Sequence, residues 1–426
     1  MSTVTITRAE ALSGIARVPG DKSISHRALL LSALASGRSV IEGLSSGDDV
    51  ARTARIARQL GASVTSEGSL VVVEGGRGRL RAATEPLDFG NSGTGFRLAM
   101  GVLSGIPGLH RLVGDASLSK RPMDRVAGPL GLMGASIAGA GERCTAPLRI
   151  EGGVLHGINY SVPVPSAQVK SAVLLAALGA QGPTTVHESV RTRPHTEEMI
   201  LEAGGSIVIS DSPDGRTISV TPSELEARRW LVASDPSQAA FFVVAGLLAR
   251  TSQVSVANLY PDATRIGFLG VLERMGADIA RRQDGGVLTV TARSSELTGT
   301  VVDAREIPSL DEVPILAVAA AAAEGTTRFE DVAELRIKES DRFAGTIALI
   351  NALGASATAE GDDIVVVGLG TPSRFATPTI DAGEDHRMAM STAIAGTVGA
   401  GAAITGFDTV DSSFPGFLDV LEGLRD

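Results

Sequence analysis

Eight short polar clusters in this chain contain the residue types that bind and transform small anions. Six of them stand at the start of a stretch rich in Ala, Leu and Val, and two lie apart from those stretches. Backbone N–H groups at the start of a helix attract negative charge, and the helix dipole adds to this attraction. Chemistry is therefore expected at the starts of several buried helices. The six clusters are residues 20–27, 90–97, 165–171, 234–238, 309–312 and 384–390, and the other two are 118–125 and 335–342.

The cationic residues in these clusters predict a site for small molecules that carry several negative charges. Lys22 and Arg27 are positive charges at the start of a predicted helix, where the helix dipole disfavours them. An anionic ligand bound between them would explain their presence. This cluster is not a P-loop, because Asp21 separates Gly20 from the lysine. Arg387 can bind a phosphate or carboxylate with two nitrogens at once.

Two clusters also contain candidate acids and bases. Asp311 stands at a predicted N-cap, where a carboxylate is usually structural, but a carboxylate facing a cationic site is a candidate base. Lys338, Glu339 and Arg342 fit either a salt-bridged helix surface or acid–base work beside a phosphate. Taken alone, residues 165–171 and 234–238 are best explained as helix caps. The six histidines show no metal-ligand spacing.

Composition excludes several classes of protein. The chain has 426 residues, 43% of them hydrophobic, which is enough for two domains with sizeable cores. A formal net charge of −10 argues against a general nucleic-acid binder. The single cysteine, Cys144, excludes an intramolecular disulfide and a cysteine-based zinc cluster. Because the sequence contains neither a stretch able to span a bilayer nor a secretion signal, we expect a cytoplasmic protein without a membrane partner.

An internal repeat sets the expected architecture. A short sequence motif centred on a glycine occurs six times, at spacings of 69 to 78 residues. Each copy is expected to end an amphipathic helix and to begin a strand. Apolar helices recur with the same period and are expected to be buried, near residues 26–36, 94–104, 168–178, 238–249, 312–324 and 387–399. Each repeat is therefore an α/β unit of the type βαβαββ.

The repeats predict two domains of three units each. One is expected at residues 18–231, and the other is discontinuous, at residues 1–17 plus 232–426. The last repeat lacks its strands, and a strand around residues 3–6 is expected to supply one of them. Ligands commonly bind in clefts between such halves, so the active site is expected there.

Read together and in order, the clusters resemble the 5-enolpyruvylshikimate-3-phosphate synthase family over essentially the whole chain. The Ile-Ser-His version of the first motif resembles the second class of that family. The resemblance implies a two-domain inside-out α/β barrel built from six βαβαββ repeats. The motifs are Gly20–Arg27, Asn91–Thr94 with Arg97, Lys120–Met123, Ser166–Gln168, Asp311–Glu312, Arg336–Arg342 and Asp385–Met390.

The resemblance also implies an activity without metal or organic cofactor. The family transfers the enolpyruvyl group of phosphoenolpyruvate to the 5-hydroxyl of shikimate 3-phosphate, through a tetrahedral intermediate, and releases phosphate on the way to chorismate. Asp311 matches the base for the 5-hydroxyl, Glu339 matches the group that handles the proton at C3, and Lys22 joins them as a catalytic residue. The matching contacts to shikimate 3-phosphate are Lys22, Ser23, Arg27, Ser166, Ala167, Gln168, Arg193, Asp311 and Lys338. Those to phosphoenolpyruvate are Lys22, Gly93, Thr94, Arg121, Gln168, Arg342, His386 and Arg387.

Two positions bear on the inhibitor glyphosate and on phosphoenolpyruvate binding. Ser412 stands where many members have a lysine, which removes one expected cationic contact. Position 93 is Gly, whereas Ala is associated with glyphosate tolerance in some members, so sensitivity or only partial tolerance is expected. We also expect a monomer, because no exposed apolar patch is evident.

Two alternatives remain on the same scaffold. The first is the sister enzyme that transfers enolpyruvate to UDP-N-acetylglucosamine. It usually carries a reactive cysteine in the loop that corresponds to residues 118–125, where this chain has none. The second is a binding protein without activity, against which the retention of Lys22, Asp311, Glu339 and Arg387 argues.

Overall fold

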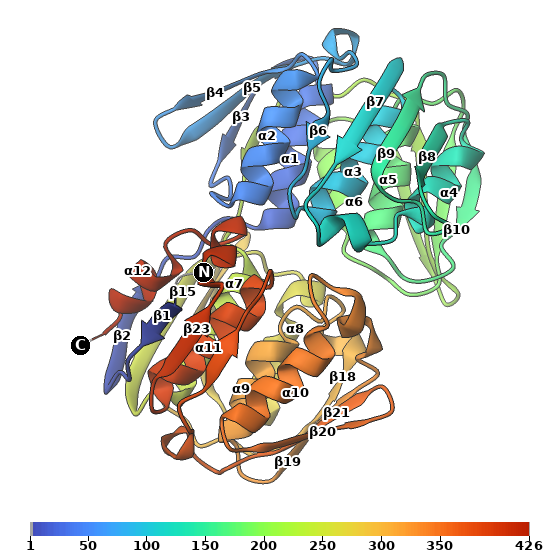
Figure 1. Cartoon of the computed structure of the whole chain (residues 1–426). Helices are drawn as coiled ribbons and strands as arrows, with labels where there is room; N and C mark the ends of the chain where they lie inside the picture. Colours follow the sequence, from blue (N-terminus) through green and yellow to red (C-terminus); the bar gives the residue numbers. More distant parts are fainter. Residues whose placement is uncertain (1–2, 426) are drawn as a thin grey trace. The chain divides into compact units, whose positions relative to one another are not determined.

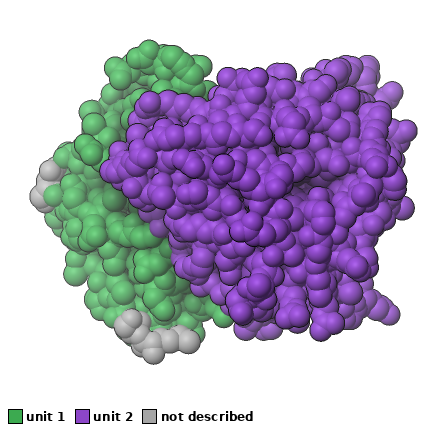
Figure 2. Space-filling model, turned by 90° about the horizontal axis from the view of Figure 1, so that it is seen from above, with its two compact units in different colours: residues 1–19, 233–426 green, residues 20–232 purple. Residues whose placement is uncertain are grey.

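The chain separates into two compact units. The computed structural model describes residues 3–425. Unit 1 comprises residues 1–19 and 233–426, and unit 2 comprises residues 20–232, coloured green and purple in Figure 2. Residues 3–19 therefore fold with the second half of the chain.

Unit 2 contains three four-stranded sheets of one pattern. The first two strands of each sheet are parallel, and the remaining neighbours are antiparallel. The sheets, in spatial order, are β14 (Arg229–Leu231), β3 (Gly37–Glu42), β5 (Leu70–Gly75) and β4 (Ser63–Glu67); β6 (Leu87–Asp88), β7 (Gly108–Val113), β9 (Thr145–Gly152) and β8 (Ser136–Ala140); and β10 (Asn159–Ser161), β11 (Thr184–Glu188), β13 (Gly215–Thr221) and β12 (Ser206–Ser212).

Unit 1 repeats this pattern twice and completes it with a smaller sheet. The four-stranded sheets are β2 (Ala11–Ala16), β15 (Thr251–Leu259), β17 (Val287–Arg293) and β16 (Asp278–Asp284), and β18 (Val301–Asp303), β19 (Thr326–Glu330), β21 (Asp363–Val367) and β20 (Ser356–Glu360). The third sheet has the order β1 (Thr3–Ile6), β23 (Ala402–Thr405) and β22 (Thr379–Asp381). β1 pairs antiparallel with β23, with Thr3 opposite Thr405. The opening strand thus completes the sixth repeat, as expected.

Strand exchange explains why unit 1 is discontinuous. β2 directly precedes the first helix of unit 2 in the chain, yet it pairs in parallel with β15 of unit 1. β14 directly precedes the first helix of the second half, yet it pairs in parallel with β3 of unit 2. Each unit therefore takes the opening strand of its first sheet from the segment that leads into the other unit.

Buried helices form the centre of each unit, and the sheets lie outside them. The central helices are α1 (Lys22–Leu34), α3 (Gly93–Ser104) and α5 (Ala167–Ala177) in unit 2, and α7 (Pro236–Leu248), α9 (Val313–Ala322) and α11 (His386–Val398) in unit 1. Every residue of α7, α9 and α11 is buried. In unit 2, α3 contacts α1 and α5, and in unit 1 the three central helices contact one another. This arrangement confirms the predicted inside-out α/β fold.

Amphipathic and short helices complete the repeats. The outer helices are α2 (Asp48–Gln59), α4 (Asp124–Leu132), α6 (His195–Glu202), α8 (Ala263–Arg274), α10 (Arg342–Ala352) and α12 (Phe417–Glu422). Figure 1 shows α9 and α10 side by side against the sheet that contains β20 and β21. Short 3-10 helices are η1 (Arg77–Arg79), η2 (Leu118–Lys120), η3 (Ala304–Glu306), η4 (Ala333–Ile337), η5 (Pro372–Arg374) and η6 (Phe407–Ser412). Within residues 3–425, no helix has the length and apolar character needed to cross a membrane.

Local signals account for where the elements begin and end. Five of the six repeat glycines have a positive φ that a side chain would strain, but Gly423 has φ −66° and lies inside a right-handed turn. α1 begins at Lys22, four residues before the predicted start, because the side chain of Asp21 caps it by accepting from the N–H of Ile24 at 2.8 Å. The five glycines with positive φ are Gly61, Gly134, Gly204, Gly276 and Gly354.

Candidate active site

In unit 2, Lys22 stands in the first turn of α1 and pairs with a carboxylate from the next helix. Its Nζ lies 3.0 Å from Oδ2 of Asp49 on α2, and its side chain is 17% exposed. The pair fixes the ammonium group beside the start of α1 while leaving it partly accessible. Lys22 is thus placed where the N–H groups of the helix start also attract an anion.

Arg27 lies one turn further along α1 and is buried. Its Nε donates to the hydroxyl of Thr196 at 2.6 Å, and its Nη2 donates to the hydroxyl of Ser171 at 2.8 Å. Nη1 donates to the backbone oxygen of Ser23 at 2.9 Å. These bonds tie α1 to α5 and α6, so the guanidinium has a fixed position.

The starts of α3 and α5 are joined by side chains of the predicted site. Gln168 donates from Nε2 to the hydroxyl of Thr94 at 2.9 Å and accepts at Oε1 from Nη1 of Arg97 at 2.8 Å. Ser166 caps α5 by accepting from the N–H of Val169 at 3.4 Å. Two predicted segments, 74 residues apart from Thr94 to Gln168, therefore meet at one place.

Arg121 borders the same place from the segment after η2. Its Nη2 donates to the side-chain oxygen of Asn91 and, at 3.2 Å, to the hydroxyl of Ser117. A Cβ added to Gly93 would lie 2.9 Å from Nη1 of Arg121 and 3.2 Å from Nη1 of Arg97. The glycine therefore leaves room for two guanidinium groups beside the start of α3.

A buried charge cluster contacts Thr192, the residue before Arg193. Nζ of Lys170 on α5 is 2.7 Å from Glu188 and 2.6 Å from Glu197, and all three side chains are at most 2% exposed. Burial raises the pKa of Glu197 above its ordinary value, although Lys170 opposes this shift. The cluster links α5, β11 and α6 and was not predicted. The available signal was a lysine inside an otherwise apolar helix.

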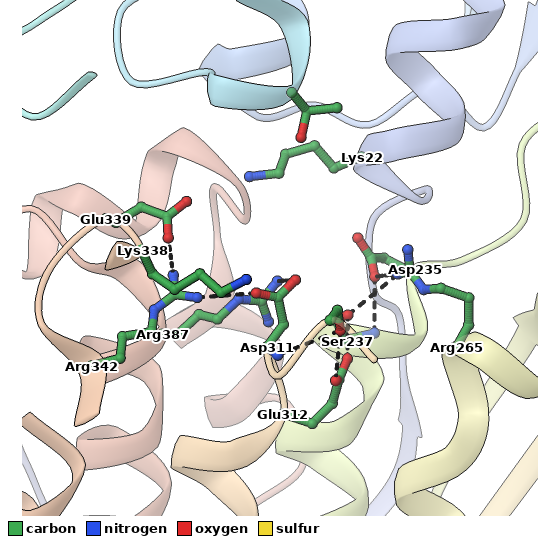
Figure 3. A network of polar contacts seen from close by, with 12 residues as sticks. Lys22, Asp235, Ser237, Arg265, Asp311, Glu312, Lys338, Glu339, Arg342 and Arg387 are labelled. Atoms are coloured by element: carbon green, nitrogen blue, oxygen red, sulfur yellow. Dashed lines mark hydrogen bonds and ion pairs between the residues drawn. The ribbon is translucent and has the colours of Figure 1, made fainter. Parts of the chain in front are cut away.

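Unit 1 gathers its charged residues around Arg342, the first residue of α10. The guanidinium is fully buried and contacts three carboxylates: Asp311 at 3.0 Å, Glu339 at 2.6 Å and Asp385 at 2.8 Å. Figure 3 shows Asp311 and Glu339 on the guanidinium of Arg342. Burial disfavours the charge on Arg342, but the three carboxylates outweigh this cost and raise its pKa above the ordinary value.

Asp311 is held between two arginines. Its Oδ1 accepts from Nη1 of Arg342, and its Oδ2 lies 3.5 Å from Nη2 of Arg387 on α11. The carboxylate remains 23% exposed, while both arginines are buried. Asp311 follows Leu310, a buried residue with a positive φ of 56°, which is uncommon for a leucine.

Asp385 caps α11 and supports Arg342 at the same time. Its Oδ1 accepts from the N–H of Arg387 at 3.0 Å, and its Oδ2 accepts from Ser340 at 2.8 Å and from Arg342 at 2.8 Å. His386, the first residue of the helix, is buried next to it. Lys338 pairs through its Nζ with the exposed Glu334 at 3.1 Å, and its own side chain is 19% exposed.

A second polar network at the starts of α7 and α9 was also missed in part. Asp235 caps α7, as predicted, and additionally pairs with the buried Arg265 at 2.8 Å. Ser237 donates to Glu312, which also accepts from Ser309 at 3.0 Å. Figure 3 shows the contacts of Asp235 with Arg265 and of Ser237 with Glu312. They fix the segment that leads into Asp311.

The structure thus assembles the predicted residues into two groups, one in each unit. The group in unit 2 comprises Lys22, Ser23, Arg27, Gly93, Thr94, Arg121, Ser166, Ala167, Gln168 and Arg193 at or near the starts of α1, α3, α5 and α6. The group in unit 1 comprises Asp311, Lys338, Glu339, Arg342, His386 and Arg387 around the starts of α9, α10 and α11. Within the described residues, no set of three or more His, Cys, Asp or Glu side chains is arranged to hold a metal ion.

Comparison with known proteins identifies the family. The sequence profile of the EPSP synthase (3-phosphoshikimate 1-carboxyvinyltransferase) family matches residues 6–421. The chain belongs to the EPSP synthase family. The profile covers both groups of polar residues, so membership does not rest on one unit alone.

Relatives of this family resemble the chain over its whole length. A 3-phosphoshikimate 1-carboxyvinyltransferase from Desulforudis audaxviator is 44% identical and covers 99% of each chain. One from Gloeobacter violaceus is 46% identical, covering 99% of this chain and 98% of the relative. The solved structure of an EPSP synthase from Acinetobacter baumannii superposes with a TM-score of 0.87 at 37% identity, covering 100% of this chain and 98% of that one.

Proposed function

We propose that this member of the EPSP synthase family transfers the enolpyruvyl group of phosphoenolpyruvate to the 5-hydroxyl of shikimate 3-phosphate and releases inorganic phosphate. The observation that carries the proposal is the contact of one buried guanidinium, that of Arg342, with the carboxylates of Asp311 and Glu339. The reaction needs two proton-handling groups held in a fixed relation beside an anionic substrate.

The two carboxylates divide the proton transfers between them. Asp311 removes the proton of the 5-hydroxyl, whose oxygen then attacks C2 of phosphoenolpyruvate. Glu339 donates a proton to C3, which gives a tetrahedral adduct with a methyl group. The adduct collapses when the C2–O bond to phosphate breaks and a proton leaves C3 for Glu339. The departing phosphate takes up the proton that Asp311 removed from the 5-hydroxyl. One carboxyl group thus cycles its proton and ends the reaction as it began.

The cationic residues bind the two substrates and hold them in reacting geometry. Fixed positive groups stabilise anions without reorganising during the reaction, and alignment of two reactants lowers the barrier further. We assign shikimate 3-phosphate to Lys22, Ser23, Arg27, Ser166, Ala167, Gln168, Arg193, Asp311 and Lys338. We assign phosphoenolpyruvate to Lys22, Gly93, Thr94, Arg121, Gln168, Arg342, His386 and Arg387.

Several finer expectations belong to this proposal. We identify the two compact units with the two domains expected from the repeats, and binding of the substrates between these domains stays a prediction. Glyphosate is expected to inhibit the enzyme, because position 93 is a glycine that leaves room beside Arg121. An inhibition constant far above the KM for phosphoenolpyruvate would contradict this expectation. A monomeric state and a cytoplasmic location also stay predictions.

Phosphate release tests the proposal directly. The purified chain is mixed with phosphoenolpyruvate and shikimate 3-phosphate, and each substrate is omitted in turn as a control. Release that needs both substrates supports the proposal. Release with UDP-N-acetylglucosamine in place of shikimate 3-phosphate would assign the chain to the sister activity. A folded protein that releases no phosphate with either acceptor would favour a binding protein without activity.

A further inference from the structure

We propose that His26 is a positioning residue that fixes the start of α3, and with it Gly93 and Thr94, against the end of α1 that carries Lys22. This inference rests on the proposed function, because it concerns the binding of phosphoenolpyruvate. His26 is absent from the residues assigned to either substrate. It lies in the same motif as Lys22 and Arg27, and it faces the interior of unit 2 with no exposed surface.

The imidazole of His26 joins three helices. From α1, its Nδ1 lies 2.8 Å from the hydroxyl oxygen of Thr53 on α2. Its Nε2 lies 3.2 Å from the hydroxyl oxygen of Ser92, the N-cap residue of α3. Both partners are buried, so these bonds are not exchanged for bonds to bulk water.

One tautomer of His26 satisfies all the neighbouring groups. In it, the hydroxyl of Thr53 donates to the backbone oxygen of Asp49 at 3.4 Å, and its oxygen accepts from Nδ1–H of His26. Nε2 of a neutral ring with that tautomer is an acceptor, and the hydroxyl of Ser92 donates to it. Burial lowers the pKa of His26 well below its ordinary value, with Lys22 adding to the shift, which agrees with a neutral ring.

The chain of bonds connects residues assigned to phosphoenolpyruvate. Ser92 accepts from the N–H of Gly95 at 3.1 Å, so it fixes the turn that contains Gly93 and Thr94. At the other end, Asp49, whose backbone accepts from Thr53, pairs through its side chain with Lys22. His26 is thus the link between the lysine and the backbone of the second helix start.

Close packing leaves the imidazole of His26 little room to move relative to Thr53 and Ser92. A Cβ added to Gly95 would lie 2.8 Å from Oγ of Ser92, 2.9 Å from Oγ1 of Thr53 and 3.1 Å from Cε1 of His26. Atoms of all three helices therefore meet at Gly95. A displaced imidazole displaces the start of α3 as well.

Shikimate 3-phosphate should depend on His26 much less than phosphoenolpyruvate does. Arg27, assigned to that substrate, is held by Thr196, Ser171 and the backbone of Ser23. None of these bonds passes through the imidazole. The inference therefore predicts a larger effect on phosphoenolpyruvate than on shikimate 3-phosphate, because Lys22 and Gln168 alone are assigned to both substrates.

The test compares three variants of the full chain with the wild type. His26→Phe keeps a planar ring and removes both hydrogen bonds, Thr53→Val keeps the side-chain shape and removes one, and Thr53→Ser retains the hydroxyl. Phosphate release is measured against phosphoenolpyruvate concentration, and binding of shikimate 3-phosphate by calorimetry. We expect His26→Phe to raise the KM for phosphoenolpyruvate about tenfold, which corresponds to one or two buried hydrogen bonds. Thr53→Val should raise the KM for phosphoenolpyruvate less, and Thr53→Ser should leave it at the wild-type value.

His110 supplies a matched control in the same unit. It is equally buried on β7, and its Nε2 lies 2.9 Å from the backbone oxygen of Ile106, away from the starts of α1 and α3. His110→Phe should lower stability without changing the KM for phosphoenolpyruvate.

Each outcome decides the question. An unchanged KM for phosphoenolpyruvate in both Thr53→Val and folded His26→Phe would overturn the inference. So would equal KM increases in His26→Phe and His110→Phe, because these would indicate a packing effect only. Wild-type protein that releases no phosphate refutes the proposed function, and the inference then falls with it. Selective loss of phosphoenolpyruvate binding, with the affinity for shikimate 3-phosphate within about twofold, establishes the positioning role.

Discussion

Replacing Gly101 by alanine should destabilise unit 2 by about 2 kcal/mol, although alanine is the better helix former. Gly101 lies inside α3, where this helix crosses α5. An added Cβ would lie 2.1 Å from the carbonyl oxygen of Ala172 and 2.8 Å from its carbonyl carbon. The obstacle is therefore the backbone of the neighbouring helix rather than a side chain that can rotate away.

The magnitude follows from the required displacement. A carbon atom and a carbonyl oxygen in contact lie about 3.3 Å apart, so α3 and α5 must separate by roughly 1.2 Å. Overpacking of a tight core costs about 3 kcal/mol at the upper end, and the helix propensity of alanine returns about 1 kcal/mol. For a unit of roughly 200 residues, the remaining 2 kcal/mol lowers Tm by about 4–8 °C.

The tryptophan of the chain makes the measurement specific to unit 2. Trp230 is the single tryptophan, it is buried, and its Nε1 donates to Ser32 at 2.9 Å. Urea unfolding followed by tryptophan fluorescence therefore reports on this unit. Gly128→Ala in α4 is the matched control, because the added Cβ would meet no atom within 4 Å. This variant should be about 1 kcal/mol more stable than the wild type, because alanine favours the helix.

The prediction also has a functional side. Gln168 at the start of α5 bonds to Thr94 at the start of α3, so separation of the helices should weaken phosphoenolpyruvate binding as well. A Gly101→Ala protein as stable as Gly128→Ala would refute the reasoning. It would mean that α3 and α5 can separate without losing packing.

Three further perturbations test the site and the buried charges. Glu339→Gln should lower turnover at least about 100-fold while the calorimetric affinity for shikimate 3-phosphate stays the same, and unchanged turnover would remove Glu339 from the mechanism. Gly93→Ala places a methyl group 2.9 Å from Arg121. It should raise the KM for phosphoenolpyruvate on the order of tenfold and the glyphosate inhibition constant by more, as steady-state kinetics will test. The pKa of His26 is lowered from 6.5 by burial and by neighbouring cations, so the unfolded chain binds its proton first as the pH falls. The free energy of unfolding of wild-type unit 2 should therefore fall by up to about 1.4 kcal/mol per pH unit below pH 6.5 through this group. In His26→Phe this part of the decrease should be absent. Urea unfolding at several pH values measures the difference.

The sequence predicted most of the local structure because its signals are local. The repeat glycines and the apolar stretches locate helix ends and buried helices within a few residues, since caps and periodicity depend on near neighbours. The exceptions have local causes as well. Asp21 caps α1 earlier than expected, and Gly423 lies in a right-handed turn.

The polar clusters indicated which residue types meet a substrate, but they did not give the partners. Lys170 was part of a recognised cluster, yet nothing in its surroundings along the chain pointed to Glu188 and Glu197. Similarly, the role of His26 depends on Thr53 and on Ser92, which is 66 residues away. Burial of a charge or a ring nitrogen requires a partner, and only the packing of helices determines which one it is.

By itself, then, the sequence determined the six-fold α/β repeat, the buried helices and the polar clusters at their starts. The tertiary structure decided that β2 pairs with β15 and β14 with β3, and that Arg342 contacts three carboxylates. The physical reason is the range of the interactions. Capping and periodicity act over a few residues and leave a pattern along the chain, whereas strand pairing and buried ion pairs join residues whose separation is set by the closed fold.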